Sequence, residues 1–150
     1  MTPCEHVRLI GTLEVGMPPE QAFQLFTARG ELAWVEGWHP DFPADTPDDS
    51  EPGTVFTTHH GEHGTFWSVT SRQGRETIAY SLTSPGDRAG LIIVGLRPSA
   101  SGTTVTVTHD LTALVPEADP ALREFASGYD RMLRQWETWI AHSLRAAAPA

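Results

Sequence analysis

The order of its residue patterns predicts that this chain has an α+β fold, in which a curved antiparallel sheet of about six or seven strands wraps around a long C-terminal helix. Two-residue periodicity, which is typical of strands, recurs from residue 54 to residue 111, and a helical pattern then fills residues 116–148. A doubly wound α/β fold needs alternating strands and helices, so this order excludes it. We expect residues 1–150 to form a single domain, with a frayed tail at residues 146–150.

Two short helices are predicted between the first strand and the rest of the sheet. Apolar and polar residues alternate over residues 7–15, which indicates a strand with one buried face. Glycine and proline at residues 16–19 end this strand, and proline suits the first turn of a helix. A short helix therefore follows over residues 20–28, and Gly30 separates it from a second helical turn at residues 31–35.

Residues 37–53 are predicted to form a long surface loop. They contain four prolines and five acidic residues and show no periodic pattern. Long loops in compact domains either cover functional sites or are mobile segments, and both roles are consistent with this one. Its acidic residues, from Asp41 to Glu51, lack the regular spacing of a calcium-binding loop and therefore indicate a solvated segment.

Two consecutive hairpins are predicted after this loop. Gly61-Glu62 suits a two-residue type II′ turn, which places Phe56 opposite Trp67. A two-residue turn at Gln73-Gly74 places Trp67 opposite Tyr80 in the next pair of strands. Both registers put the same apolar side chains on one face of the sheet, and a one-residue slip would scatter them. This face consists of Phe56, Trp67, Val69, Ile78, Tyr80 and Leu82.

The last two strands and the C-terminal helix supply the rest of the predicted core. Residues 90–97 form a nearly continuous apolar strand, and the strand over residues 104–111 turns its valine side inward. Asp119-Pro120 suits the cap and the first residue of the helix over residues 116–148. Apolar residues recur along that helix at three- and four-residue steps and form one wide stripe. The stripe consists of Leu122, Phe125, Tyr129, Met132, Leu133, Trp136, Ile140 and Leu144.

Composition and charge narrow the classes of partner and location. The formal net charge is −9, from 10 basic and 19 acidic residues, which argues against nucleic acid and against an anionic membrane surface as partners. Cys4 is the single cysteine, so the chain has no internal disulfide, and we expect a cytoplasmic location. The N-terminal residues lack a signal-peptide pattern, and no apolar run approaches the roughly 18 residues of a membrane helix.

Several short motifs carry a family resemblance. They are residues 19–26, residues 36–42, Gly53-Thr54-Val55-Phe56, Trp67-Ser68-Val69 and Trp136. Together with the order of elements, these motifs resemble the START-like or SRPBCC superfamily, which has the helix-grip fold of the birch-pollen allergen. Within it, the motifs look like the bacterial branch described as polyketide cyclase/dehydrase-like or chaperone-ATPase-activator-like. The resemblance covers essentially the whole chain and implies a cavity between sheet and helix that binds a small hydrophobic molecule, although the fold alone does not select a function.

Nine side chains are candidates to contact such a ligand. Aromatic rings on the predicted sheet face and on the helix stripe would line the cavity, with a methionine as an adaptable filler and two tryptophans near the mouth. The same rings can instead fill the core, as aromatic side chains usually do. The nine candidates are Trp34, Trp38, Phe56, Trp67, Tyr80, His109, Tyr129, Met132 and Trp136.

His109 is the candidate for acid–base chemistry. It occupies an inward position on an otherwise apolar strand face, and the imidazole pKa lies near neutrality. A pocket tyrosine, Tyr80 or Tyr129, would be its partner. The alternative is a structural histidine that bonds a neighbouring hydroxyl or reaches solvent near the strand end.

Neither a metal nor a cofactor is predicted. His59, His60 and His63 lie around a tight turn, where three ligands rarely gather tetrahedrally, so they indicate a solvated hairpin tip. The chain has no nucleophile motif, phosphate-binding loop or dinucleotide fingerprint.

Three functional hypotheses follow. The first is a protein that binds a small hydrophobic molecule without chemistry of its own. The second is a cofactor-free cyclase, dehydratase or hydrolase that uses His109 with a pocket tyrosine. The third is a protein-interaction module, similar to chaperone co-regulators. Exposed strand edges can pair into a homodimer or be shielded by the helices, and the sequence is consistent with both.

Overall fold

The computed structural model describes residues 3–147 and contains one six-stranded antiparallel sheet, with strand order β1-β6-β5-β4-β3-β2. The strands are β1 (His6–Val15), β2 (Val55–His60), β3 (His63–Gln73), β4 (Thr77–Ser84), β5 (Arg88–Ser99) and β6 (Gly102–Ala113). The helical elements are α1 (Pro19–Ala22), η1 (Phe23–Phe26), η2 (Gly30–Ala33), η3 (Pro116–Ala118), α2 (Asp119–Ser127) and α3 (Tyr129–Ala147). The predicted α+β fold is confirmed.

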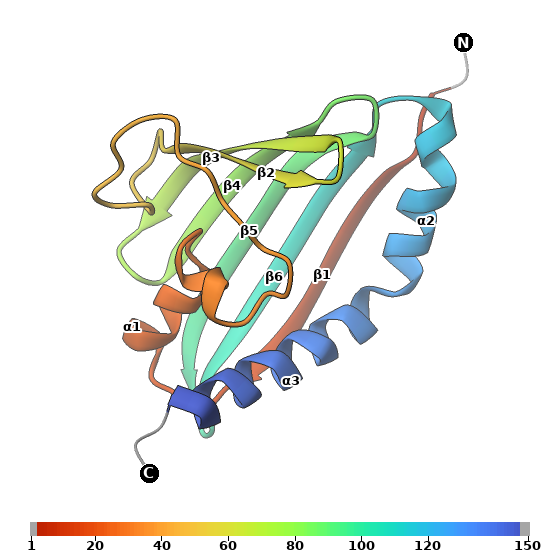
Figure 1. Cartoon of the computed structure of the whole chain (residues 1–150). Coiled ribbons are helices and arrows are strands. Elements are labelled where there is room, and N and C mark those ends of the chain that lie inside the picture. Colours follow the sequence, from red (N-terminus) through yellow and green to blue (C-terminus); the bar gives the residue numbers. More distant parts are fainter. Residues whose placement is uncertain (1–2, 148–150) are drawn as a thin grey trace.

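Helices α2 and α3 lie along the sheet beside β1 and meet at an angle (Figure 1). Strand β1 alternates between exposed and inward residues, and its inward residues Leu13 and Val15 are buried. Gly11 brings β1 close to α3, because a methyl group at this position would collide with Leu133 and contact the ring of Tyr129. The main core therefore lies between the sheet and α3. No helix among the described residues is long and apolar enough to span a membrane.

The first predicted hairpin is confirmed. His60 pairs with His63 and Phe56 with Trp67, as the two-residue turn requires. Gly61 has a φ of +64°, and no residue other than glycine has a positive φ in the described chain, which agrees with a type II′ turn. The register between β2 and β3 thus follows directly from the glycine.

The second predicted hairpin register is wrong by two residues. Trp67 pairs with Leu82 and Val69 with Tyr80, because the connecting loop has three residues and β3 contains a bulge between Val69 and Ser71. A three-residue loop alone would turn Trp67 away from the face that carries Tyr80. The extra residue in the bulge restores the alternation, so the predicted apolar face is nevertheless preserved.

The C-terminal helical segment is divided at Gly128 into α2 and α3. The division lets each helix follow a different part of the sheet: Leu122 of α2 packs on a small cluster with Leu111, whereas Leu133 of α3 packs on the main core. Asp119 is the first residue of α2, and its carboxylate accepts a hydrogen bond from the backbone N–H of Glu5 at 2.8 Å instead of capping the helix. Helix α3 continues through Ala147, and the remainder of the predicted frayed tail, residues 148–150, lies outside the described residues.

Hydrogen bonds tie the long loop both to strand β2 and to the residue that precedes η2. Asp41 and Thr57 form an isolated β-bridge with backbone hydrogen bonds of 2.8 and 2.9 Å. Farther along, Asp49 is buried and its carboxylate accepts the backbone N–H of Arg29 at 2.8 Å. These contacts hold the start of the loop against β2 and its end against η2.

We expect substitution of two glycines by alanine to have opposite effects on stability. A Cβ at Gly90 would collide with the backbone oxygen of Asp110, so Gly90→Ala should lower the free energy of unfolding by about 2–3 kcal/mol. At Gly128 the φ is −97° and a Cβ makes only ordinary contacts, so Gly128→Ala should raise it by about 0.5–1 kcal/mol. Urea unfolding of both variants checks this, and a stabilising Gly90→Ala would contradict the close strand approach.

Candidate functional site

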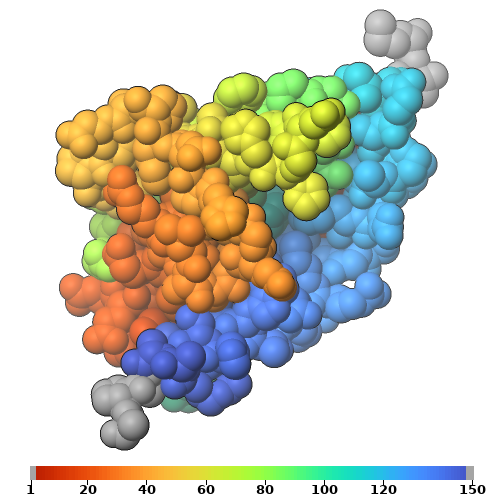
Figure 2. Space-filling view, viewed as in Figure 1, coloured from red at the N-terminus to blue at the C-terminus, as the bar shows by residue number. Residues whose placement is uncertain are grey.

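A cavity of about 250 Å³ lies between the sheet and the helices. It is mainly apolar and is enclosed by parts of η1, η2, the long loop, strands β2 to β6 and both C-terminal helices. The lining residues are Phe26, Glu31, Trp38, Phe56, Trp67, Tyr80, Ile92, Val94, His109, Phe125, Met132 and Trp136. Figure 2 shows a recess bordered by the β2–β3 hairpin, the orange segment after η2 and the blue helices. The same elements supply lining residues of the cavity, so this recess is its opening.

Aromatic rings build the wall of the cavity on the β2–β3 side. Phe56 and Trp67 stack with a centroid distance of 5.6 Å and an interplanar angle of 3°. Trp38, at the start of the loop, meets both rings edge-on, and Phe42 packs on Phe56 at 5.7 Å. The indole N–H of Trp38 donates to the carbonyl of Ala28 at 2.7 Å, which fixes the ring. This wall therefore depends on the loop as well as on the sheet.

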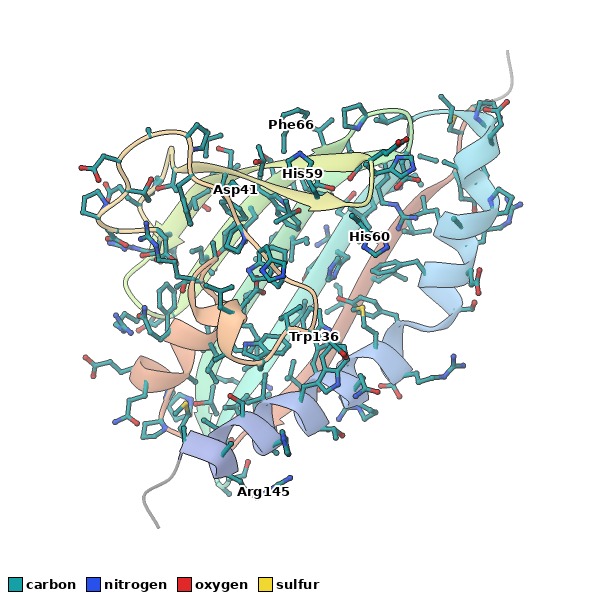
Figure 3. The ribbon with its side chains drawn as sticks, viewed as in Figure 1. Asp41, His59, His60, Phe66, Trp136 and Arg145 are labelled. Carbon is teal, nitrogen blue, oxygen red and sulfur yellow. The ribbon has the colours of Figure 1, made fainter. Side chains whose placement is uncertain are left out.

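Seven of the nine predicted ligand contacts line the cavity, and Trp34 and Tyr129 do not. Trp34 was expected near the mouth but is buried in the core, where its N–H donates to the carbonyl of Leu25 at 2.7 Å. Its ring supports the cavity from behind by meeting Trp136 edge-on at 5.5 Å. Trp136 rises from α3 toward the sheet (Figure 3).

His109 lines the cavity and is held in one tautomer. The Tyr129 hydroxyl donates to the carbonyl of Val107 at 2.9 Å, so its oxygen accepts the Nδ1–H of His109 at 2.8 Å. His109 Nε2 consequently carries the free lone pair, and it has no hydrogen-bond partner among the described residues. Burial lowers the pKa of His109 from 6.5 to about 4, so the imidazole is neutral at pH 7.

Glu31 is the functional candidate that the sequence did not reveal. It belongs to η2 and lines the cavity with a carboxyl group that has no hydrogen-bond partner among the described residues. Burial and, second, the nearby Asp49 carboxylate raise the pKa of Glu31 from 4.5 to about 8. At neutral pH this carboxyl group keeps its proton. A short helical turn after Gly30 has no periodicity that marks Glu31 as inward, which explains why sequence patterns missed it.

The two tyrosines that were candidate partners of His109 use their hydroxyl groups within the protein. Tyr80 donates to the carbonyl of Phe26 at 2.7 Å, and Tyr129 donates to Val107. Burial raises the pKa of both tyrosines, and the Glu31 and Asp49 carboxyl groups raise that of Tyr80 further. Neither hydroxyl proton is available to a ligand, whereas the Glu31 carboxyl group has no hydrogen-bond partner among the described residues.

The histidines of the first hairpin are not among the residues that line the cavity. His59 lies beside Asp41, with 4.0 Å between its Nδ1 and a carboxylate oxygen of Asp41 (Figure 3). Within residues 3–147, no group of three histidine, cysteine, aspartate or glutamate side chains is placed to hold a metal ion. A larger hollow of about 660 Å³, lined by loop residues 43–55, opens broadly to solvent and does not enclose a ligand.

Comparisons with known proteins show what fold this chain shares. No family model and no curated protein matches the sequence. A protein from Mesorhizobium loti superposes with a TM-score of 0.68 at 15% identity, covering 95% of this chain and 100% of that one. An uncharacterized protein from Rhizobium leguminosarum gives 0.65 at 17% identity, covering 93% and 97%. DynU16, a protein of the dynemicin biosynthetic locus, gives 0.60 at 17% identity, covering 93% of this chain but 48% of DynU16. At these identities the likeness shows a shared helix-grip-like fold.

We expect Glu31→Gln to change the pH dependence of stability. Folded protein holds the Glu31 proton between pH 4.5 and about 8, whereas unfolded protein releases it, so stability falls as pH rises through this window. Glu31→Gln should remove that decline and raise the melting temperature at pH 8.5 by on the order of 5 °C, with little change at pH 4.5. Thermal unfolding monitored by circular dichroism checks this. Equal shifts at both pH values would contradict a proton held by Glu31.

We expect His109→Gln to change the pH dependence of stability on the acid side. Unfolded protein binds a proton at this histidine below pH 6.5, whereas the folded protein does not until about pH 4, so His109 lowers stability as pH falls through that range. The variant should flatten the acid side of the same unfolding profile. Exposed Glu36→Gln and His142→Gln are matched controls and should leave both sides unchanged.

Proposed function

We propose that this chain binds a small, neutral, largely apolar molecule of one or two rings in the cavity between sheet and helices. One observation carries the proposal: the aromatic cavity is lined by Glu31 and His109, whose carboxyl group and Nε2 have no hydrogen-bond partner among the described residues. A few polar groups that converge on an apolar cavity are the usual means by which a protein orients a bound ligand, so their presence here is a reason to expect one.

The volume supports a ligand of limited size. An apolar protein cavity of about 150 Å³ holds benzene, so a cavity of about 250 Å³ suits one or two rings. A long lipid chain or an extended polycycle needs more space than these walls enclose. The ligand expected from the volume is therefore smaller than many hydrophobic molecules that the START-like resemblance would allow.

The chemistry of the cavity wall favours a neutral and mostly flat ligand. The stacked pair of Phe56 and Trp67 and the edge of Trp38 offer surfaces for a ring. Protonated Glu31 can donate a hydrogen bond and neutral His109 can accept one, while neither offers a charge to balance an ion. DynU16, which shares the fold, belongs to the dynemicin biosynthetic locus, and this origin is consistent with a ring compound as ligand.

We expect 2-naphthol, a neutral two-ring probe, to bind with a dissociation constant on the order of 10–100 μM. Ile92→Trp places a larger side chain in the cavity and should weaken binding at least about tenfold, as should Met132→Trp from the helix side. Leu91→Trp is the matched control, because the neighbouring Leu91 is 41% exposed and points away from the cavity. Isothermal titration calorimetry measures all four proteins, and circular dichroism verifies that each variant is folded.

The cavity proposal would be contradicted if wild type did not bind 2-naphthol, or if Leu91→Trp weakened binding as much as Ile92→Trp. Native mass spectrometry of the purified protein provides a separate check on the functional class. A bound small molecule supports ligand binding, whereas a second protein at stoichiometric levels would favour the protein-interaction hypothesis.

A further inference from the structure

We infer that the cavity catalyses proton transfer at a carbon next to a carbonyl group, with Glu31 as the acid and His109 as the base. The inference rests on the proposed function, because the ring compound must first bind in the cavity. It assigns the bound molecule to a chemical class, neutral cyclic ketones with a hydrogen on the adjacent carbon. Glu31 thus takes the role of acid that Tyr80 or Tyr129 was expected to have beside His109.

The two groups reach the same cavity from different walls. His109 projects from β6 of the sheet, and its ring contacts Phe125 at 5.3 Å and Trp136 at 6.2 Å between centroids. Glu31 comes from η2, on the segment that connects β1 to the loop, and lies near Tyr80. A ring held between these walls can be approached by a proton donor and a proton acceptor at once.

Each group is in the protonation state that the reaction needs. The base must lack a proton, and His109 Nε2 does because Tyr129 accepts the hydrogen on Nδ1. The acid must carry a proton, and burial keeps one on Glu31 up to a pKa of about 8. The ionisable groups that face Glu31 are Asp49 and Tyr80, and Tyr129 faces His109. In water the ordinary pKa values of the two side chains would leave glutamate ionised at pH 7, so the folded cavity creates this pair.

The proposed step moves one proton from the substrate carbon to His109 and one from Glu31 to the substrate oxygen. His109 Nε2 takes the proton from the carbon, and the C–H electron pair becomes a C=C bond. The carbonyl oxygen receives the Glu31 proton as the C=O bond becomes a C–O single bond, which gives the neutral enol. An imidazolium and a carboxylate remain, and they attract one another across the apolar cavity. Return of a proton from Nε2 to the same or a conjugated carbon, and of the hydroxyl proton to Glu31, completes an exchange or an isomerisation without a co-reactant.

The lining also disfavours acyl transfer. None of the described lining residues carries a serine or threonine hydroxyl, a thiol or an amine that could attack a carbonyl carbon. The mainly apolar walls lower the local dielectric constant, which strengthens hydrogen bonds to a developing oxyanion. Proton transfer is the chemistry that a donor and an acceptor can perform without a nucleophile.

The test uses 2-tetralone, a neutral two-ring ketone, in deuterated buffer with the whole chain of 150 residues. Loss of its proton signals at the carbons beside the carbonyl is followed by NMR against buffer alone. Wild type should accelerate this exchange, and His109→Gln and Glu31→Gln should each reduce the protein-dependent rate by on the order of 10²-fold. Exposed His142→Gln and Glu36→Gln are matched controls and should retain the wild-type rate.

The pH profile separates a chemical role from a structural one. The wild-type rate should form a plateau between about pH 4 and 8 and fall on either side, as His109 gains its proton or Glu31 loses its own. Glu31→Gln should lose the alkaline fall while still binding 2-naphthol. Tyr129→Phe, which changes a positioning residue, should lower the rate without moving the alkaline limit.

Each outcome of these experiments bears on one of the two proposals. If 2-naphthol binds to wild type but tetralone exchange equals the buffer rate, the acid–base inference is overturned and ligand binding stands. Accelerated exchange that persists in both Gln variants also overturns it. If neither ring compound binds, the proposed function fails and the inference falls with it.

Discussion

The hydrogen bonds of Tyr129 to β6 connect the architecture of this protein to its cavity. Tyr129 is the first residue of α3, directly after the division at Gly128, and its hydroxyl joins the carbonyl of Val107 to the imidazole of His109. Its ring also lies beside Gly11 of β1. One side chain thus ties the helix to two strands, and it leaves His109 Nε2 facing the cavity. A helix placed differently would close the cavity or free the imidazole.

Two residues of the cavity, Glu31 and His109, lower the free energy of unfolding of the protein. Glu31 and His109 both sit in surroundings that oppose their charged forms, so stability declines above pH 4.5 through Glu31 and below pH 6.5 through His109. Apolar replacements would remove both costs. Strongly shifted pKa values that gather in one cavity are typical of functional sites, and here they occur on two elements far apart in sequence. The two residues that suit this cavity to the proposed ligand are therefore also residues that lower the stability of the protein.

Much of the cavity wall could be predicted because it follows sheet alternation. Phe56, Trp67 and Tyr80 share a face in any register that differs by an even number of residues, so the two-residue error in the second hairpin did not move them. The bulge in β3 was not predictable from local pattern, since an extra residue leaves alternation unchanged on either side. Glu31 was missed for a related reason: an inward carboxyl on a single turn of helix has no periodic neighbours that reveal its direction.

By itself, the sequence determined the α+β class, the inward face of the strands and the inward position of His109, because these depend on periodicities of two and about four residues. Only the tertiary structure decided the break at Gly128, the tautomer of His109 and the protonated state of Glu31. The tautomer and the protonated state each depend on groups from separate elements, Val107 with Tyr129 in the first case and Asp49 with Glu31 in the second. Hydrogen bonding and desolvation act over distances in space, and a linear pattern contains no information about which distant groups will meet.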